Sequence, residues 1–305
     1  MHLLLILTSI LPASSQAPSS PQIQSPAFWE HWGDGRAEIA GYKLEFDRYG
    51  EKRHGQAVTI FVTETFDHDQ HVKVDRRATG PQYPVMKLNL VRDFQTGIYD
   101  YNTMLSAFVS LETTPSLSKG APAKISFSSQ EWCGHVYHQL LFDEDKAHET
   151  VHSYFDREAD QARTLSLPTN TVSLDTLWHW ARGLAGPGLE AGESITVPAL
   201  PTLLSARLNH HPVSLGRVTM TRGGKTQRVH LDAGTFDVEV FTAELEGGPQ
   251  WRFEVEAAAP HRIIRWTNSK GEQATFQGSE RLAYWKLSGP SGHEKLKALG
   301  IAPLP

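Results

Sequence analysis

Strand-like runs separated by turn residues recur along most of the chain, and this pattern constrains the fold more than any other feature. The runs are rich in Val, Ile, Thr, Phe and Tyr, with Gly, Asn and Pro between them. Two of them flank Tyr49-Gly50-Glu51, which predicts an antiparallel hairpin. From about residue 190 onward the runs follow at short intervals, and strands adjacent in sequence usually pair. The pattern therefore predicts an all-β protein.

One segment has the pattern of a helix instead. Residues 173–184 begin with Ser173 as a plausible N-cap and end at Gly183, and their apolar residues recur at helical spacing. The apolar stripe comprises Leu174, Leu177, Trp178 and Ala181. We expect one short helix that packs on the sheets. Residues 96–112 fit either a strand or a short helix that starts near Asn102.

The N-terminus has the features of an export signal. An apolar run of nine residues starts at Leu3, and the small residues Ser15 and Ala17 follow it. The run is too short to cross a bilayer, which needs about 20 residues, but it suits the apolar region of a signal peptide. No Lys or Arg precedes it. We expect a signal peptide over 1–17, a disordered lead-in over 18–27, and a periplasmic or secreted mature protein that does not span the membrane.

Composition limits which classes of protein this chain can belong to. The chain has 305 residues, 39% of them hydrophobic, and a formal net charge of -5. This content supports a sizeable core, and the absence of a basic stripe argues against nucleic-acid binding. No motif for a cofactor is present, so none is expected. We predict a β-rich domain over 28–189 and an antiparallel β-meander over 190–305, with one continuous sheet through both as an alternative.

Both halves resemble bacterial exported proteins. The C-terminal half, with "GTFDVEVFTAEL" and "APHRIIRWTNSKGEQATFQGSERLAYW", resembles an exported domain family of unknown function that is similar to the half-barrels of periplasmic lipoprotein carriers. This resemblance covers about residues 170–287. It implies curved antiparallel half-barrel-like sheets whose concave face holds a lipid-like or glycan ligand.

The N-terminal half is similar to a set of uncharacterised exported proteins. The shared stretches are "YKLEFDRYGEKRHG", "KLNLVRDFQTGIYDY" and "SSQEWCGH". Some of these proteins carry the label septum formation inhibitor Maf. That label implies a cytoplasmic α/β pyrophosphatase with a Ser-Pro-Arg-Arg-type motif near its start, and this N-terminus contains no such motif. The Maf label therefore does not suit this chain.

The stretch around the single cysteine is the first candidate site. If residues 127–142 form one strand, Glu131, Cys133 and His135 share a face, because successive side chains alternate. Trp132, Val136 and His138 then belong to the opposite, apolar face. Cys133 and His135 would lie about 7 Å apart at their Cβ atoms, which permits a shared metal if a third ligand comes from elsewhere. An ordinary half-buried strand with a packed thiol explains the same pattern.

A second candidate follows Arg92. This segment gathers carboxylates, a guanidinium and two phenols around Gly97, a group that could bind a polar ligand or do acid–base chemistry. Its members are Arg92, Asp93, Tyr99, Asp100 and Tyr101. A turn with a salt bridge and packed tyrosines is the simpler interpretation.

Three functions remain open. The first is an envelope-associated binding protein for a lipid-like or glycan ligand. The second is a hydrolase or metal-dependent enzyme that uses Glu131, Cys133 and His135 with Arg92 and Asp100. The third is a structural module that binds a protein partner of the cell envelope.

Overall fold

The computed structural model describes residues 25–76 and 80–302. The expected signal peptide and most of the lead-in lie outside the described residues. Ser25, the first described residue, accepts a hydrogen bond from the Phe28 N–H through its side chain and so caps the first helix. The helices and 3-10 turns are α1 (Pro26–Trp32), η1 (Leu174–Thr176), α2 (Leu177–Ala181), α3 (Leu203–Asn209), η2 (Tyr284–Lys286), η3 (Pro290–Gly292) and α4 (His293–Ala298).

Seventeen strands make up the rest of the regular structure, so the all-β prediction is confirmed. The first nine are β1 (Ala37–Arg48), β2 (Glu51–Asp67), β3 (Val72–Lys73), β4 (Gln82–Thr96), β5 (Tyr99–Ser110), β6 (Pro122–Glu131), β7 (Gly134–Phe142), β8 (Lys146–Ser153) and β9 (Gln161–Ser166). The others are β10 (Val172–Ser173), β11 (Ser194–Leu200), β12 (Gly216–Arg222), β13 (Gln227–Leu231), β14 (Gly234–Leu245), β15 (Gln250–Glu256), β16 (Ile263–Asn268) and β17 (Gln273–Leu282).

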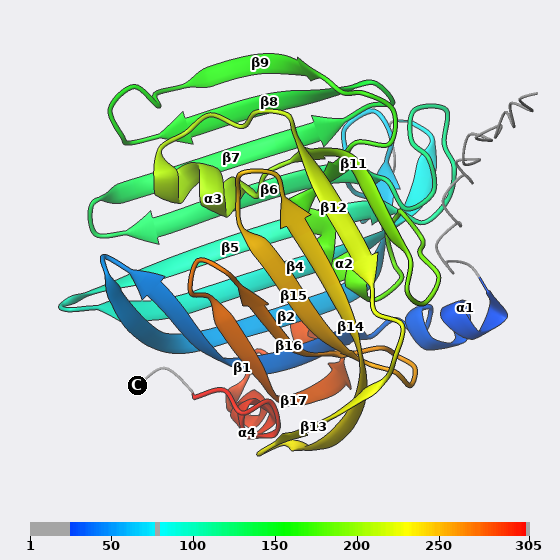
Figure 1. The fold of residues 1–305 in the computed structure, drawn as a ribbon, viewed down its shortest axis with the longest axis vertical. Helices are drawn as coiled ribbons and strands as arrows, with labels where there is room; N and C mark the ends of the chain where they lie inside the picture. The colour runs from blue at the N-terminus through cyan, green and yellow to red at the C-terminus, as the bar shows by residue number, and fades with distance from the viewer. Residues whose placement is uncertain (1–24, 77–79, 303–305) are drawn as a thin grey trace, which may run out of the picture.

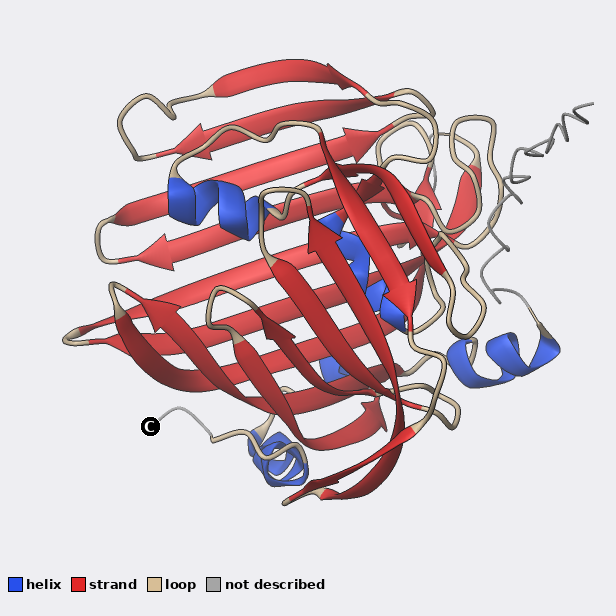
Figure 2. Cartoon of the chain, viewed as in Figure 1, coloured by secondary structure: helices blue, strands red, loops and turns tan. Residues whose placement is uncertain are grey.

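A single hydrogen-bonded sheet runs through both predicted halves. β1 is the junction, because it pairs with β2 on one side and with β17 on the other. On the first side β2, β4, β5, β6, β7, β8 and β9 follow in order, and on the second side β16, β15, β14, β12 and β11 follow. All of these pairs are antiparallel; β10 alone joins β11 in parallel. Figures 1 and 2 show that the sheet doubles over, so that β12 and β14–β16 lie in front of the long strands β2 and β4–β6, whereas β9 stands clear at the top edge.

Local sequence accounts for the first hairpin. Arg48 pairs with Glu51, so Tyr49 and Gly50 form a two-residue turn, and both have positive φ angles of 57° and 74°. Such a turn matches the twist of its flanking strands. The hairpin prediction is confirmed, and the ambiguous segment 96–112 proves to contain strand β5.

The prediction of one strand over 127–142 is wrong. The chain reverses at Trp132 and Cys133, so that Glu131 on β6 pairs with Gly134 on β7. Neither Trp132 nor Cys133 has a positive φ angle, and Gly134, directly after them, lies so close to Tyr154 that a Cβ atom there would stand 2.4 Å from its ring. Trp132 was expected on the core face but is 69% exposed at the tip of this hairpin. The alternation of buried and exposed side chains therefore restarts in β7, whose buried side chains include Val136 and His138.

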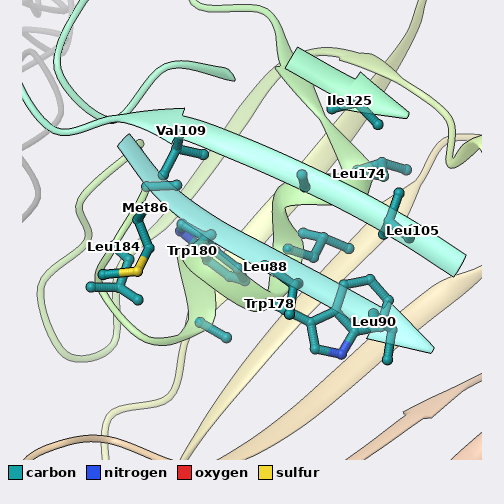
Figure 3. Packing of buried hydrophobic residues seen from close by; sticks show 14 of the residues in the cluster. Met86, Leu88, Leu90, Leu105, Val109, Ile125, Leu174, Trp178, Trp180 and Leu184 are labelled. Carbon is teal, nitrogen blue, oxygen red and sulfur yellow. The ribbon is translucent and has the colours of Figure 1, made fainter. Parts of the chain in front are cut away.

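The predicted helix forms as η1 and α2, and it lies between the two layers. Ser173 caps it through a hydrogen bond from the Asp175 N–H, as expected. Figure 3 shows Leu174 and Trp178 of this segment against Leu88 and Leu105 of strands β4 and β5. These residues belong to one buried cluster that spans both layers. The expectation of a single helix was incomplete, because α1, α3 and α4 are too short to show a long periodic pattern.

A buried ion pair ties this helix to the junction strand. Arg182, directly after α2, donates to both carboxylate oxygens of Glu38 on β1, at 2.7 and 3.1 Å. It also donates to the backbone carbonyls of Pro260 and His261, and its guanidinium stands 4.4 Å from the Phe61 ring centroid. Every part of this buried charge has a partner, as burial requires. The pair fixes the helix between the layers and so shapes the space beside it.

A candidate ligand-binding cavity between the layers

A cavity of about 740 Å³ remains between the layers on one side of α2. Its lining comes from β1, β4 and β5, from η1 and α2, from α3 and the loop after it, and from the β14–β15 and β16–β17 turns. The concave face of the sheet is thus only partly filled by its own side chains. The volume lies in the range of small-molecule sites, about 300–1,000 Å³.

Helix α3 forms one wall. Thr202 caps it by accepting a hydrogen bond from the Ser205 N–H, and His210 ends it in the left-handed conformation, at a φ of 53°. No helix was predicted here from the sequence, because seven residues are too few to show a long periodic pattern. Leu204 and Leu208 line the cavity from α3. The helix therefore presents apolar side chains to the space between the layers.

The other walls contribute further apolar side chains, which alternate with polar and charged ones. Leu105, Trp178, Leu245 and Trp251 line the cavity from β5, α2, β14 and β15. Leu215, in the loop before β12, lines it as well and stays 46% exposed. A single exposed leucine is ordinary on a protein surface, and here it extends the apolar part of the lining.

Ionic groups occupy both the exposed rim of the cavity, with Asp47, Glu246 and Lys270, and the buried part of its lining. Arg92 on β4 is 2% exposed, and its Nε donates to Oε1 of Glu272 at 2.8 Å. Glu272 also accepts hydrogen bonds from the indole N–H of Trp266 at 2.8 Å and from the side chain of Asn268 at 3.0 Å. The guanidinium of Arg92 lies 5.3 Å from the ring centroid of Trp178. The opposite charges of Arg92 and Glu272 compensate each other, and the pair places a fixed dipole beside the cavity.

Asp175 is the unusual group in this lining. Its carboxyl is 1% exposed and accepts a hydrogen bond from the Leu203 N–H at 2.9 Å. Burial raises its pKa from 3.8 to about 7, against the lowering effects of that hydrogen bond and of Arg92. Near neutral pH a large part of this carboxyl therefore carries a proton, and a protonated carboxyl donates one O–H hydrogen bond. Perturbed groups of this kind concentrate at functional sites.

Trp178 adds a second donor. Its ring lines the cavity, its side chain is 1% exposed, and its indole N–H has no hydrogen-bond partner among the described residues. A buried donor without a partner costs free energy. The indole nitrogen of Trp178 and the carboxyl of Asp175 are almost wholly shielded, so both groups lie within the wall of the cavity.

Of the predicted site residues, Arg92 alone lines this cavity. Tyr101 does not line the cavity itself but is hydrogen-bonded to Arg48, which does. Arg48 donates to the Tyr101 hydroxyl at 3.2 Å. The Tyr101 hydroxyl also contacts that of Tyr49 at 2.7 Å, and burial raises the pKa of Tyr101. Tyr99 lies beside Tyr101, with ring centroids 6.0 Å apart. These tyrosines brace the β1–β2 hairpin against β5.

Glu131, Cys133 and His135 do not share a face, contrary to the prediction. Glu131 is buried on the core face of β6, where its carboxylate binds Nη2 of Arg207 from α3. Cys133 is exposed in the turn. His135 pairs with Gln130 and is exposed on the opposite face. The turn at residues 132 and 133 shifts the alternation and so separates the three side chains.

Asp100 also lies apart from the cavity. Its carboxylate accepts a hydrogen bond from the indole N–H of Trp132 at 3.1 Å, at the exposed ends of the β4–β5 and β6–β7 hairpins. Within the described residues, no group of three or more His, Cys, Asp or Glu side chains could hold a metal ion. The geometry thus does not assemble the residues on which the enzyme hypothesis depended.

Asp175, Glu272 and Arg48 were not among the site residues predicted from the sequence. Asp175 was visible as an acidic residue in the first turn of the predicted helix, where a carboxylate is common. Its burial follows from contacts with α3 that are distant in sequence. Glu272 lies in a short turn after Asn268 and carries no local signal. From the sequence alone, each of these residue types is accounted for by its place in a helix or a turn, so none of them indicated a ligand.

Comparisons with known proteins give little further information. No family model matches the chain, and no curated protein matches it. A solved structure described as a β-barrel-like protein of a domain of unknown function, DUF1849, from Brucella abortus is similar at a TM-score of 0.48 and 12% identity, over 81% of this chain and 98% of that one. No helix within 25–76 or 80–302 has both the length and the apolar character to cross a membrane.

Proposed function

We propose that this protein is an exported binding protein that holds a lipid-like ligand in the cavity between its two layers. The observation that carries the proposal is the cavity itself: apolar side chains from α3, β5 and β14 line it together with polar and charged ones, and the buried groups Asp175 and Trp178 lie in its wall. An amphipathic molecule suits this lining, because its hydrocarbon part would contact the leucines and its polar end would bind the polar and charged side chains.

Native mass spectrometry of the mature protein, purified without detergent from the periplasm of an expression host, tests this function. We expect an adduct of lipid-like mass that mild activation removes. The variant Ser205→Trp inserts a large ring into the cavity from α3, where Ser205 is half-buried and lines the space. We expect the adduct to disappear in this variant.

A matched substitution controls for a general effect of the added tryptophan. Ser194 is exposed on β11 and does not line the cavity, so Ser194→Trp should leave the adduct intact. If the wild-type protein carries no adduct and takes up none from fatty acid or lysophospholipid in solution, the proposed function is wrong. An adduct that survives Ser205→Trp would place the ligand elsewhere.

A further inference from the structure

A second hollow lies on the face of the sheet that is turned away from the core. It has a volume of about 510 Å³ and spans strands β5 to β8. Its lining is polar: amide, hydroxyl, imidazole and carboxylate groups surround one tyrosine ring. We call it the outer groove. It lies on the opposite face of β5 and β6 from the interlayer cavity, and nothing in the proposed function uses it.

Strand pairing builds the groove from two parallel rows of side chains. Asn102, Gln130 and His135 form the first row, because Asn102 pairs with Gln130 and Gln130 with His135. The second row comprises Ser128, Tyr137 and His152, which pair in the same manner. Positions two residues apart on a strand lie about 7 Å apart, so the rows are separated by about the length of one sugar ring.

The tyrosine supplies an apolar face within this polar lining. Tyr137 is 40% exposed, and its ring is nearly parallel to that of His152, with centroids 6.5 Å apart and an interplanar angle of 23°. Its hydroxyl donates to the side chain of Gln139 at 2.9 Å, which fixes the ring on the sheet. An aromatic ring held flat in this manner can pack against the C–H face of a sugar while its neighbours bind the hydroxyls.

The charges around the groove select against anions. No lysine or arginine is among the residues that line it in the described chain. Its carboxylates are Asp160, which contacts His152 at 2.9 Å, and Asp93, which lies beside the groove and accepts from Asn102 at 2.5 Å. Burial raises the pKa of Asp93, and the negative charge of Asp100 raises it further. Phosphate or an acidic glycan would meet like charge here.

We infer that the outer groove binds a short segment of a neutral oligosaccharide, with one sugar stacked on Tyr137 and hydroxyls bound by the two polar rows. The amides of Asn102 and Gln130 offer both donors and acceptors, as a polyol requires.

Titration of the full-length mature protein with maltotetraose and chitotetraose, followed by NMR chemical shifts and calorimetry, tests this inference. We expect at least one of these neutral probes to bind and to shift the amides of residues 128–137. Tyr137→Ala should weaken that binding at least about fivefold, the equivalent of about 1 kcal/mol for a lost aromatic contact. Gln130→Ala, on an exposed side chain, should weaken it as well, and Trp285→Ala should not, since Trp285 is an exposed aromatic outside the groove.

Three results would overturn the inference. The first is that neither neutral probe binds at millimolar concentration. The second is that Tyr137→Ala and Gln130→Ala both fold, by their thermal unfolding, and bind like the wild type. The third is that tetragalacturonate, an anionic probe of the same length, binds while the neutral probes do not. Ser205→Trp, which blocks only the interlayer cavity, should leave oligosaccharide binding unchanged, so this test and that of the cavity fail independently.

Discussion

Asp175 should make the protein less stable as the pH rises through neutrality. Its carboxyl has a pKa of about 7 in the fold and an ordinary value of 3.8. Between these values the folded chain holds a proton that the unfolded chain has lost. The stabilising contribution is complete below about pH 4 and is lost as the pH rises through 7. At 1.36 kcal/mol per pH unit, the gap between the two values gives a loss of up to about 4 kcal/mol above pH 8.

The variant Asp175→Asn isolates this contribution. Asparagine has nearly the same shape, and its side-chain oxygen can still accept the hydrogen bond from the Leu203 N–H. Because the amide does not titrate, the variant lacks the loss that the wild type undergoes between about pH 4 and pH 7. We therefore expect Asp175→Asn to be more stable than the wild type by about 4 kcal/mol at pH 8.5 and by only about 1.6 kcal/mol at pH 5.

Urea unfolding of both proteins from pH 4.5 to 8.5 measures the effect. All other titrating groups contribute equally to the two proteins, so the difference between their free energies of unfolding reports Asp175 alone. The difference should grow by more than about 2 kcal/mol across this range. A difference that stays constant from pH 5 to 8.5 would refute the assignment of a raised pKa to this buried carboxyl.

Three further perturbations test the packing. Burial lowers the pKa of His179 to about 3, so only the unfolded chain takes up a proton as the pH falls below about 6.5. The free energy of unfolding should therefore fall by up to about 5 kcal/mol toward pH 3. In urea unfolding, His179→Gln should reduce this loss, and an unchanged dependence on pH would contradict the lowered pKa. Glu38→Gln leaves the buried charge of Arg182 without its partner and should cost about 3–5 kcal/mol by the same measurement, with partial recovery on adding Arg182→Met; a neutral effect would show that the pair does not hold the helix. Gly41→Ala would place a methyl group 2.0 Å from a backbone carbonyl of the C-terminal segment and should lower the melting temperature and expose that segment to protease, whereas Gly289→Ala, where nothing lies within 4 Å, should do neither.

Local sequence was sufficient for most of the regular structure. Hairpins such as β1–β2, and the helix that Ser173 caps, depend on alternation, turn residues and caps that act over a few positions. The same local rules failed at Trp132 and Cys133. Neither residue is a typical turn former, so a run that continued through them was expected, and the reversal there moved Glu131 and His135 to opposite faces.

The candidate sites depend on contacts between distant residues, which local sequence patterns do not predict. Arg92 could be named from sequence as a residue of interest, but its partner Glu272 lies 180 positions away. No local pattern indicates that pairing, because it depends on how far the sheet bends before β16–β17 meets β4. The outer groove was equally hidden: Asn102, Gln130 and His135 align only when the register of three strands is known.

By itself, the sequence determined that this protein is built of antiparallel strands with a short helix, because alternation, caps and turns are properties of neighbouring residues. Tertiary structure alone decided that one sheet doubles over on itself through β1, which pairs with both β2 and β17. That folding buries Asp175, raises its pKa and leaves a cavity beside it. Burial and cavity volume are sums over contacts between distant segments, so they exist only once the layers have met.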